Sequence, residues 1–212
     1  MALTITPMAD LGWTCPEFTL NTVFGEKKSL SMLTPKGHPF LVMFICNHCP
    51  YVKAIEDRLI QLTNDLQKIS VPVIAICSND ATENSEDRLE NLRQRAIEKK
   101  YPFTYLHDEE QYVAKLLGAV CTPDFFLFDK EHKLSYRGRL DDSWKDATKV
   151  TRQELLIAAQ ILSRQASATS SAELSNSAAS TSSTTIGTTT NTNSIDFGFP
   201  IKPSMGCNIK WR

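Results

Sequence analysis

Two cysteines at positions 46 and 49 form the part of this sequence that most directly suggests chemistry. They enclose Asn47 and His48, and Pro50 follows at once. A C-x-x-C between a strand and the beginning of a helix can cycle between a dithiol and a disulfide. Only the thiolate form of a cysteine attacks a disulfide, so the site must stabilise negative charge on sulfur. We therefore predict a redox-active pair at Cys46 and Cys49.

The order of the two cysteines predicts their roles. Cys46 comes first and is expected to meet the positive end of the helix dipole, which favours the nucleophile at this position. Cys49 lies one turn further on and can attack the mixed disulfide that Cys46 forms, which releases the reduced partner. A protonated or hydrogen-bonding His48 would favour the Cys46 thiolate further and make the disulfide more oxidising.

The flanking sequence predicts the strand and the helix that such a pair needs. Residues 40–45 are all apolar, which is typical of a strand buried on both faces. Pro50 suits the first position of a helix, and apolar residues then recur every three or four positions as far as Leu66. Further strands are expected at 71–77, 103–106, 125–128 and 134–137, and further helices near 86–99, 110–117 and 151–164. This order predicts an α/β fold with a mixed β-sheet flanked by helices, closed by an antiparallel hairpin.

The composition divides the chain into three parts. Residues 1–165 are predicted to form one domain, which begins with a small β-hairpin extension around 16–20 and 28–30. In residues 166–194, 17 of the 29 residues are Ser or Thr, which is typical of a disordered low-complexity linker inserted into the chain. Residues 195–212 regain aromatic and apolar side chains, so we expect this C-terminal tail to pack on the domain.

Charge and hydropathy exclude several classes of protein. The net charge of the 212 residues is −1 and the basic residues are scattered, which argues against binding of nucleic acid or of an anionic membrane. No apolar stretch approaches the ~20 residues that span a bilayer, and no secretory signal is evident, so a cytoplasmic protein is expected. In that reducing compartment the six cysteines are expected as thiols, ligands or redox groups. Without a glycine-rich phosphate loop, no cofactor is predicted.

Two further motifs resemble the redoxin (AhpC/TSA) branch of the thioredoxin fold. Residues 12–20 resemble its opening G-x-x-A-P-x-F-x-L, and residues 118–129 are similar to its G-x-x-x-T-P-x-x-F-L-F-D. The element order from about 40 to 164 resembles the thioredoxin fold itself. The resemblance implies a cis bond between Thr122 and Pro123, in a loop that faces Cys46. Such a loop would expose backbone groups that could pair with an incoming peptide strand.

The resemblance implies a thiol-disulfide oxidoreductase that acts on protein or small-molecule disulfides and is served by a thiol electron donor. Its site would be shaped by residues beside the two cysteines and by the proline loop: Asn47, His48, Pro50, Thr122 and Pro123. Thioredoxins usually carry Trp before the first cysteine, where this chain has Ile45, so the partner surface is expected to differ. The sequence predicts no oligomeric state.

Two alternatives stay open. The Cys49-Pro50 pair resembles the Cys-Pro of peroxiredoxins, but the Thr or Ser that those enzymes carry three residues earlier is replaced by Cys46, so a thiol peroxidase is the weaker prediction. The thiols of Cys46, Cys49 and Cys207, with His48, could instead bind zinc or copper(I), although a closed site would depend entirely on the tail.

Two further cysteines are candidates for an accessory role. Cys121 lies next to the predicted proline loop, and Cys207 lies in the tail. Packing as a small apolar residue is the default for a buried cysteine. Cys207 could alternatively serve as a third redox cysteine.

Overall fold

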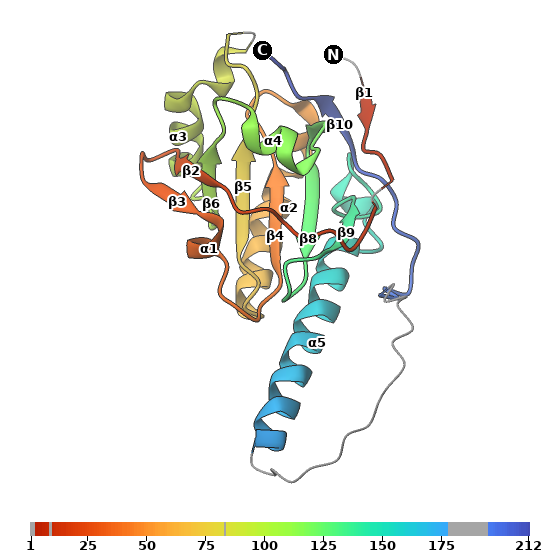
Figure 1. Cartoon of the computed structure of the whole chain (residues 1–212). Helices are drawn as coiled ribbons and strands as arrows, with labels where there is room; N and C mark the ends of the chain where they lie inside the picture. Colours follow the sequence, from red (N-terminus) through yellow and green to blue (C-terminus); the bar gives the residue numbers. More distant parts are fainter. Residues whose placement is uncertain (1–2, 9, 83, 178–194) are drawn as a thin grey trace.

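The computed structural model describes residues 3–8, 10–82, 84–177 and 195–212, with the side chains of 170–177 excepted. Its main sheet has seven strands in the order β3-β2-β6-β5-β4-β8-β9 (Figure 1). In chain order these strands are β2 (Thr19–Thr22), β3 (Lys27–Ser29), β4 (Phe40–Phe44), β5 (Val73–Cys77), β6 (Thr104–His107), β8 (Asp124–Phe128) and β9 (Leu134–Gly138). The predicted mixed sheet is confirmed, because β4 pairs parallel with β5 and antiparallel with β8.

Helices cover both faces of this sheet. One face packs against α2 (Pro50–Lys68), α3 (Leu89–Glu98) and α5 (Glu154–Ser177), and the other against α1 (Leu30–Leu33) and α4 (Tyr112–Leu117). Alternate residues of β4 pack into the hydrophobic cores on the two faces of the sheet. Leu41 and Met43 point to the first face, and Val42 and Phe44 to the second. Two-sided burial explains why this strand is apolar throughout.

The elements around the C-x-x-C agree with the sequence prediction except at one helix. The helix predicted near 86–99 is instead a 3₁₀ turn, η1 (Ser85–Asp87), followed by α3. Asp87 is fully buried and accepts hydrogen bonds from the backbone of the C-x-x-C loop. This long-range contact fixes the turn, and the local helical pattern gives way to it.

The two ends of the chain form a second, three-stranded sheet. β10 (Met205–Asn208) lies between β1 (Leu3–Ile5) and β7 (Cys121–Thr122), antiparallel to both, and the pairing of β1 with β10 is visible where the termini meet in Figure 1. Upstream in the tail, Phe197 is buried with its ring 5.9 Å from that of Tyr136. The predicted docking of the C-terminal tail is therefore confirmed.

The segment predicted as a linker begins as a helix. After a short 3₁₀ turn, η2 (Ala147–Lys149), α5 continues through 166–177, and residues 178–194 lie outside the described part of the chain. The hydroxyl groups of Ser167 and Thr169 donate to the carbonyl oxygens of Ser163 and Gln165, four residues earlier, so these side chains are satisfied within the helix. In the segments that the structure describes, no helix is both long and apolar enough to cross a membrane.

Candidate active site

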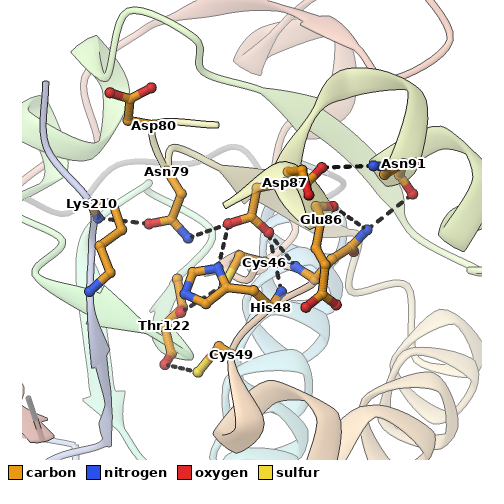
Figure 2. A network of polar contacts seen from close by, with 12 residues as sticks. Cys46, His48, Cys49, Asn79, Asp80, Glu86, Asp87, Asn91, Thr122 and Lys210 are labelled. Carbon is orange, nitrogen blue, oxygen red and sulfur yellow. Dashed lines mark hydrogen bonds and ion pairs between the residues drawn. The ribbon is translucent and has the colours of Figure 1, made fainter. Parts of the chain in front are cut away.

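The C-x-x-C lies between the end of β4 and the beginning of α2. α2 begins at Pro50, and Cys49 is its N-cap residue, whereas Cys46 belongs to the loop before it. Both side chains are buried, with Cys46 2% and Cys49 0% exposed. The Sγ of Cys46 is 3.2 Å from the Thr122 Oγ1, and the Sγ of Cys49 lies 3.1 Å from the Thr122 carbonyl oxygen, to which it donates when protonated (Figure 2). The Thr122–Pro123 bond is cis, as the resemblance implied, and Thr122 contacts both cysteines.

A buried carboxylate holds the loop between the two cysteines. Asp87 Oδ1 accepts the backbone N–H groups of Asn47 at 2.9 Å and His48 at 3.2 Å. Its Oδ2 lies 2.5 Å from the His48 Nδ1 and accepts the Asn79 side-chain amide at 3.1 Å. The same Nδ1 is 3.6 Å from the Cys46 Sγ, so His48 connects the carboxylate to the first cysteine.

Sequence patterns did not reveal Asp87 or Asn79 as part of the site. Asp87 is 40 residues from Asn47, and nothing in its neighbourhood distinguishes it from other acidic residues. A weak signal existed for Asn79, since it follows the carboxyl end of β5, the edge at which open α/β sheets carry their sites. Asn47 is further fixed by its side-chain amide, which donates to the carbonyl oxygens of Glu86 and Asn91.

The two sulfur atoms differ in electrostatic environment. A hydrogen bond from Cys46, together with the Thr122 hydroxyl and the backbone N–H groups of Val52 and Cys207, lowers the pKa of Cys49 to about 5 despite its burial. Burial, the hydrogen bond to Cys49 and the nearby Asp87 raise the pKa of Cys46. The directions of these two shifts favour the thiolate on Cys49, with the Cys46 thiol as its hydrogen-bond donor.

These shifts favour Cys49, whereas sequence order predicts the thiolate on Cys46, so the attacking sulfur stays a prediction that a trapping experiment must test. The prediction from sequence order assumed that the first cysteine occupies the helix N-terminus. In the structure Cys49 is the N-cap, and the backbone N–H of Val52 faces its sulfur. Cys46 lies three positions earlier and is closer to the unfavourable charge of Asp87.

We expect a titration of the reduced protein to show one thiolate with a midpoint near pH 5. The far-ultraviolet absorbance of the thiolate reports this step without requiring access to the buried sulfur. The pKa of Cys49 is lower in the folded than in the unfolded chain, so the thiolate stabilises the folded state. Its contribution to the free energy of unfolding is complete above the ordinary thiol pKa. That contribution is lost as the pH falls through about 5.

The matched controls are two serine variants. Cys49→Ser should remove the low-pH step, and Cys77→Ser should leave it, because burial raises the pKa of the Cys77 thiol. A step near pH 5 that persists in Cys49→Ser would show that another group carries the charge.

The edge that was predicted to receive a partner strand is already paired. β10 runs along β7, with Cys207 opposite Thr122 and Asn208 opposite Cys121. The two accessory candidates, Cys207 and Cys121, differ in their contacts. The Cys207 side chain is 1% exposed and interacts with Cys49. The Cys121 thiol instead donates to the Pro123 carbonyl oxygen at 3.6 Å. The tail therefore places a third thiol beside the pair.

The residues that the structure groups as possible metal ligands differ from the predicted set. Within the described segments, the ligand atoms of Cys46, His48 and Asp87 lie within 4.8 Å of one another, and all three residues are buried. The His48 Nδ1 in this group is already 2.5 Å from the Asp87 Oδ2. This contact explains the three groups as a hydrogen-bonded network, so the geometry does not by itself call for a metal.

Comparison with known proteins agrees with this architecture. Residues 11–137 match the model of the AhpC/TSA family. No curated protein matches the chain significantly. The crystal structure of an uncharacterized conserved protein from Geobacillus kaustophilus is 36% identical, with a TM-score of 0.78 over 100% of this chain and 97% of that one. A hypothetical protein from Sinorhizobium meliloti 1021 is 32% identical, with a TM-score of 0.80 over 99% and 98%.

A more distant structure confirms the predicted thioredoxin fold. The thioredoxin domain of a thiol-disulfide oxidoreductase from Bacteroides vulgatus is 20% identical and has a TM-score of 0.51 over 61% of this chain and 89% of that one. At this identity the likeness concerns the fold alone.

Proposed function

The chain belongs to the AhpC/TSA family, and from this membership and the geometry of the site we propose that it is a thiol-disulfide oxidoreductase with Cys46 and Cys49 as its redox couple. The observation that carries the proposal is the placement of two buried cysteines between β4 and α2, both in contact with Thr122 of the cis-proline loop. The lowered pKa of Cys49, about 5, supports it. A stabilised thiolate favours the dithiol form, which makes the corresponding disulfide more oxidising.

The lowered pKa of Cys49 supports the following order of steps. The Cys49 thiolate attacks one sulfur of a partner disulfide, which forms a mixed disulfide and releases the first partner thiolate. Cys46 then loses its proton and attacks the Cys49 Sγ, which forms the Cys46–Cys49 disulfide and releases the second partner thiolate. The departing partner thiolate takes up the proton that Cys46 loses. A thiol donor reverses these steps. The roles are thus opposite to those expected from sequence order.

An apolar cavity beside the proline loop is suited to an apolar side chain of a partner. It has a volume of about 360 Å³ and is lined in part by Pro123, Met205 and the rings of Tyr51 and Trp144, which are tilted by 33° to each other with their centroids 4.6 Å apart. Tyr51 follows Pro50 directly, so an occupant would lie close to the start of α2. We therefore propose protein disulfides as one class of partner. The cytoplasmic compartment stays a prediction.

The wild-type protein is expected to catalyse the reduction of insulin disulfides by dithiothreitol, and the Cys46→Ser/Cys49→Ser variant is expected to lose this activity. Both sulfur atoms of the couple are absent from the variant, so no thiolate attacks the substrate. The measurement is the rate at which the reduced insulin chains precipitate. Cys15→Ser, which alters a cysteine of the opposite core, is the matched control and should retain the wild-type rate.

A full rate in the double variant would contradict the proposal.

Family membership and the Cys49 thiolate also favour a second candidate, a thiol peroxidase. In this reaction Cys49 would attack a peroxide oxygen, and Cys46 would then resolve the sulfenic acid with release of water. Rapid, stoichiometric loss of the two thiols with hydrogen peroxide, without insulin reduction, would favour that candidate. Thiols that survive substoichiometric peroxide for minutes would exclude it.

A further inference from the structure

The tail strand β10 is held firmly against the proline loop. Before Cys207, the Ser204 hydroxyl donates to the Pro123 carbonyl oxygen at 3.0 Å. After it, the backbone N–H of Ile209 donates to the Val120 carbonyl oxygen at 3.0 Å. β1 covers the other edge of the strand. These contacts on both sides fix the position of Cys207 relative to the C-x-x-C.

Gly206 allows the strand to approach the site this closely. A Cβ atom at this position would lie 2.0 Å from the Thr122 carbonyl oxygen and 2.5 Å from its carbonyl carbon. Both are backbone atoms and cannot rotate away, so a side chain here would push β10 off the loop. The same Thr122 carbonyl oxygen lies 3.1 Å from the Cys49 Sγ, which places Gly206 and its neighbour Cys207 directly beside the second cysteine.

The sulfur of Cys49 contacts both of the other thiols. The side chain of Cys46 interacts with it from the loop, and that of Cys207 from β10, and all three belong to one buried cluster. Further along the tail, the backbone N–H of Lys210 donates to the Asn79 Oδ1 at 2.9 Å, and the Asn79 amide donates to Asp87 (Figure 2). The tail is therefore connected both to the cysteine pair and, through Asn79, to Asp87.

Resting on the proposed function, we propose that Cys207 is a third redox cysteine, which takes the disulfide from the Cys46–Cys49 pair as Cys49–Cys207. In this step the Cys207 thiolate attacks the Cys49 Sγ. The Cys49–Cys207 bond forms, the Cys46–Cys49 bond breaks, and Cys46 leaves as a thiolate that takes up the proton lost by Cys207. The exchange conserves electrons and needs no further oxidant. It links the tail to the site and returns Cys46 to the reduced state.

The electrostatics of Cys207 change in the direction that this step requires. Burial and then the neighbouring Cys49 raise the pKa of Cys207 to about 12 in the reduced protein, while Lys210 lowers it. Once Cys49 is part of a disulfide it carries no charge, so it no longer raises the pKa of Cys207. Cys207 is therefore a better nucleophile when the pair is oxidised than when it is reduced.

The test uses the full chain carrying Cys46→Ser and oxidised glutathione as the oxidant. The Cys49 thiolate attacks the glutathione disulfide and releases one glutathione, and Cys207 then displaces the second. We expect peptide mapping by mass spectrometry to find a Cys49–Cys207 disulfide in most molecules. Cys46→Ser/Cys121→Ser should form the same link, which controls for the other nearby thiol. Adding Gly206→Ala to Cys46→Ser should abolish the link and leave Cys49 carrying glutathione.

Stable glutathione on Cys49 in the Cys46→Ser variant itself would overturn the inference. The wild-type protein separates this failure from a failure of the proposed function: a Cys46–Cys49 disulfide and insulin reduction without any Cys49–Cys207 link would refute the third cysteine alone. Absence of both the disulfide and the turnover in the wild type would refute both. Circular dichroism of each variant shows that an absent link does not come from an unfolded chain.

Discussion

Replacing Cys49 by serine is expected to lower kcat/KM for a disulfide substrate by roughly 10³-fold or more. The reason is that the reduced site concentrates its charge on this sulfur, through hydrogen bonds from Cys46, from the Thr122 hydroxyl and from two backbone N–H groups. A serine hydroxyl remains protonated in the same surroundings and does not attack disulfides. Insulin reduction under saturating dithiothreitol measures the loss.

The complementary variant tests the order of the steps. Without a resolving thiol, a Cys49 mixed disulfide has no intramolecular route of release, so it should accumulate. Because Cys207 also lies beside Cys49, the trapping variant is Cys46→Ser/Cys207→Ser. We expect it to carry one covalently bound partner, located on Cys49 by mass spectrometry.

The matched comparison is Cys49→Ser/Cys207→Ser, which keeps Cys46 as the remaining member of the pair. Cys46 should form little mixed disulfide, since burial and Asp87 raise the pKa of its thiol. If this second variant traps the partner and the first does not, Cys46 attacks and Cys49 resolves, as sequence order predicts. The outcome distinguishes which sulfur attacks, whereas loss of activity alone does not.

Local patterns were sufficient to predict the scaffold. The continuous apolar run of β4, the proline that opens α2 and the glycine that ends α4 are all short-range signals. Each was confirmed: β4 is buried along its length, Pro50 is the first residue of α2, and Gly118 caps α4 with a left-handed φ of 68°. These signals work because they depend on steric and hydrogen-bonding properties of neighbouring residues.

The site itself depends on contacts that no local pattern encodes. Asp87 reaches the loop from a turn 40 residues away, and Cys207 pairs with a strand 85 residues earlier in the sequence, at Thr122. The motif identified the two cysteines, but the distribution of charge between them depends on these distant groups. Sequence order therefore predicts Cys46 as the attacking sulfur, whereas the lowered pKa of Cys49 favours Cys49, and the trapping variants decide between them.

The carboxylate of Asp87 is expected to be the largest single polar contribution to the stability of the site. It is fully buried and accepts two backbone N–H groups and two side-chain N–H groups, from Asn47, His48 and Asn79. Asp87→Ala would leave these donors buried without an acceptor. Loss of one partner from such a buried network costs about 3–5 kcal/mol. At roughly 2–4 °C per kcal/mol for a chain of this size, the Tm should fall by about 6–20 °C.

Thermal unfolding of the reduced protein measures this effect, and Asp57→Ala is its control. Asp57 carries the same carboxylate, but its side chain is 87% exposed and pairs with Lys99 at the surface. Exposed pairs contribute little, so the Tm of the control should stay near that of the wild type. A wild-type Tm in Asp87→Ala would mean that water or a rearranged loop satisfies the four donors. In that case the strand and helix on either side of the loop would determine its conformation. Asp87 would then affect the two thiols through its charge alone.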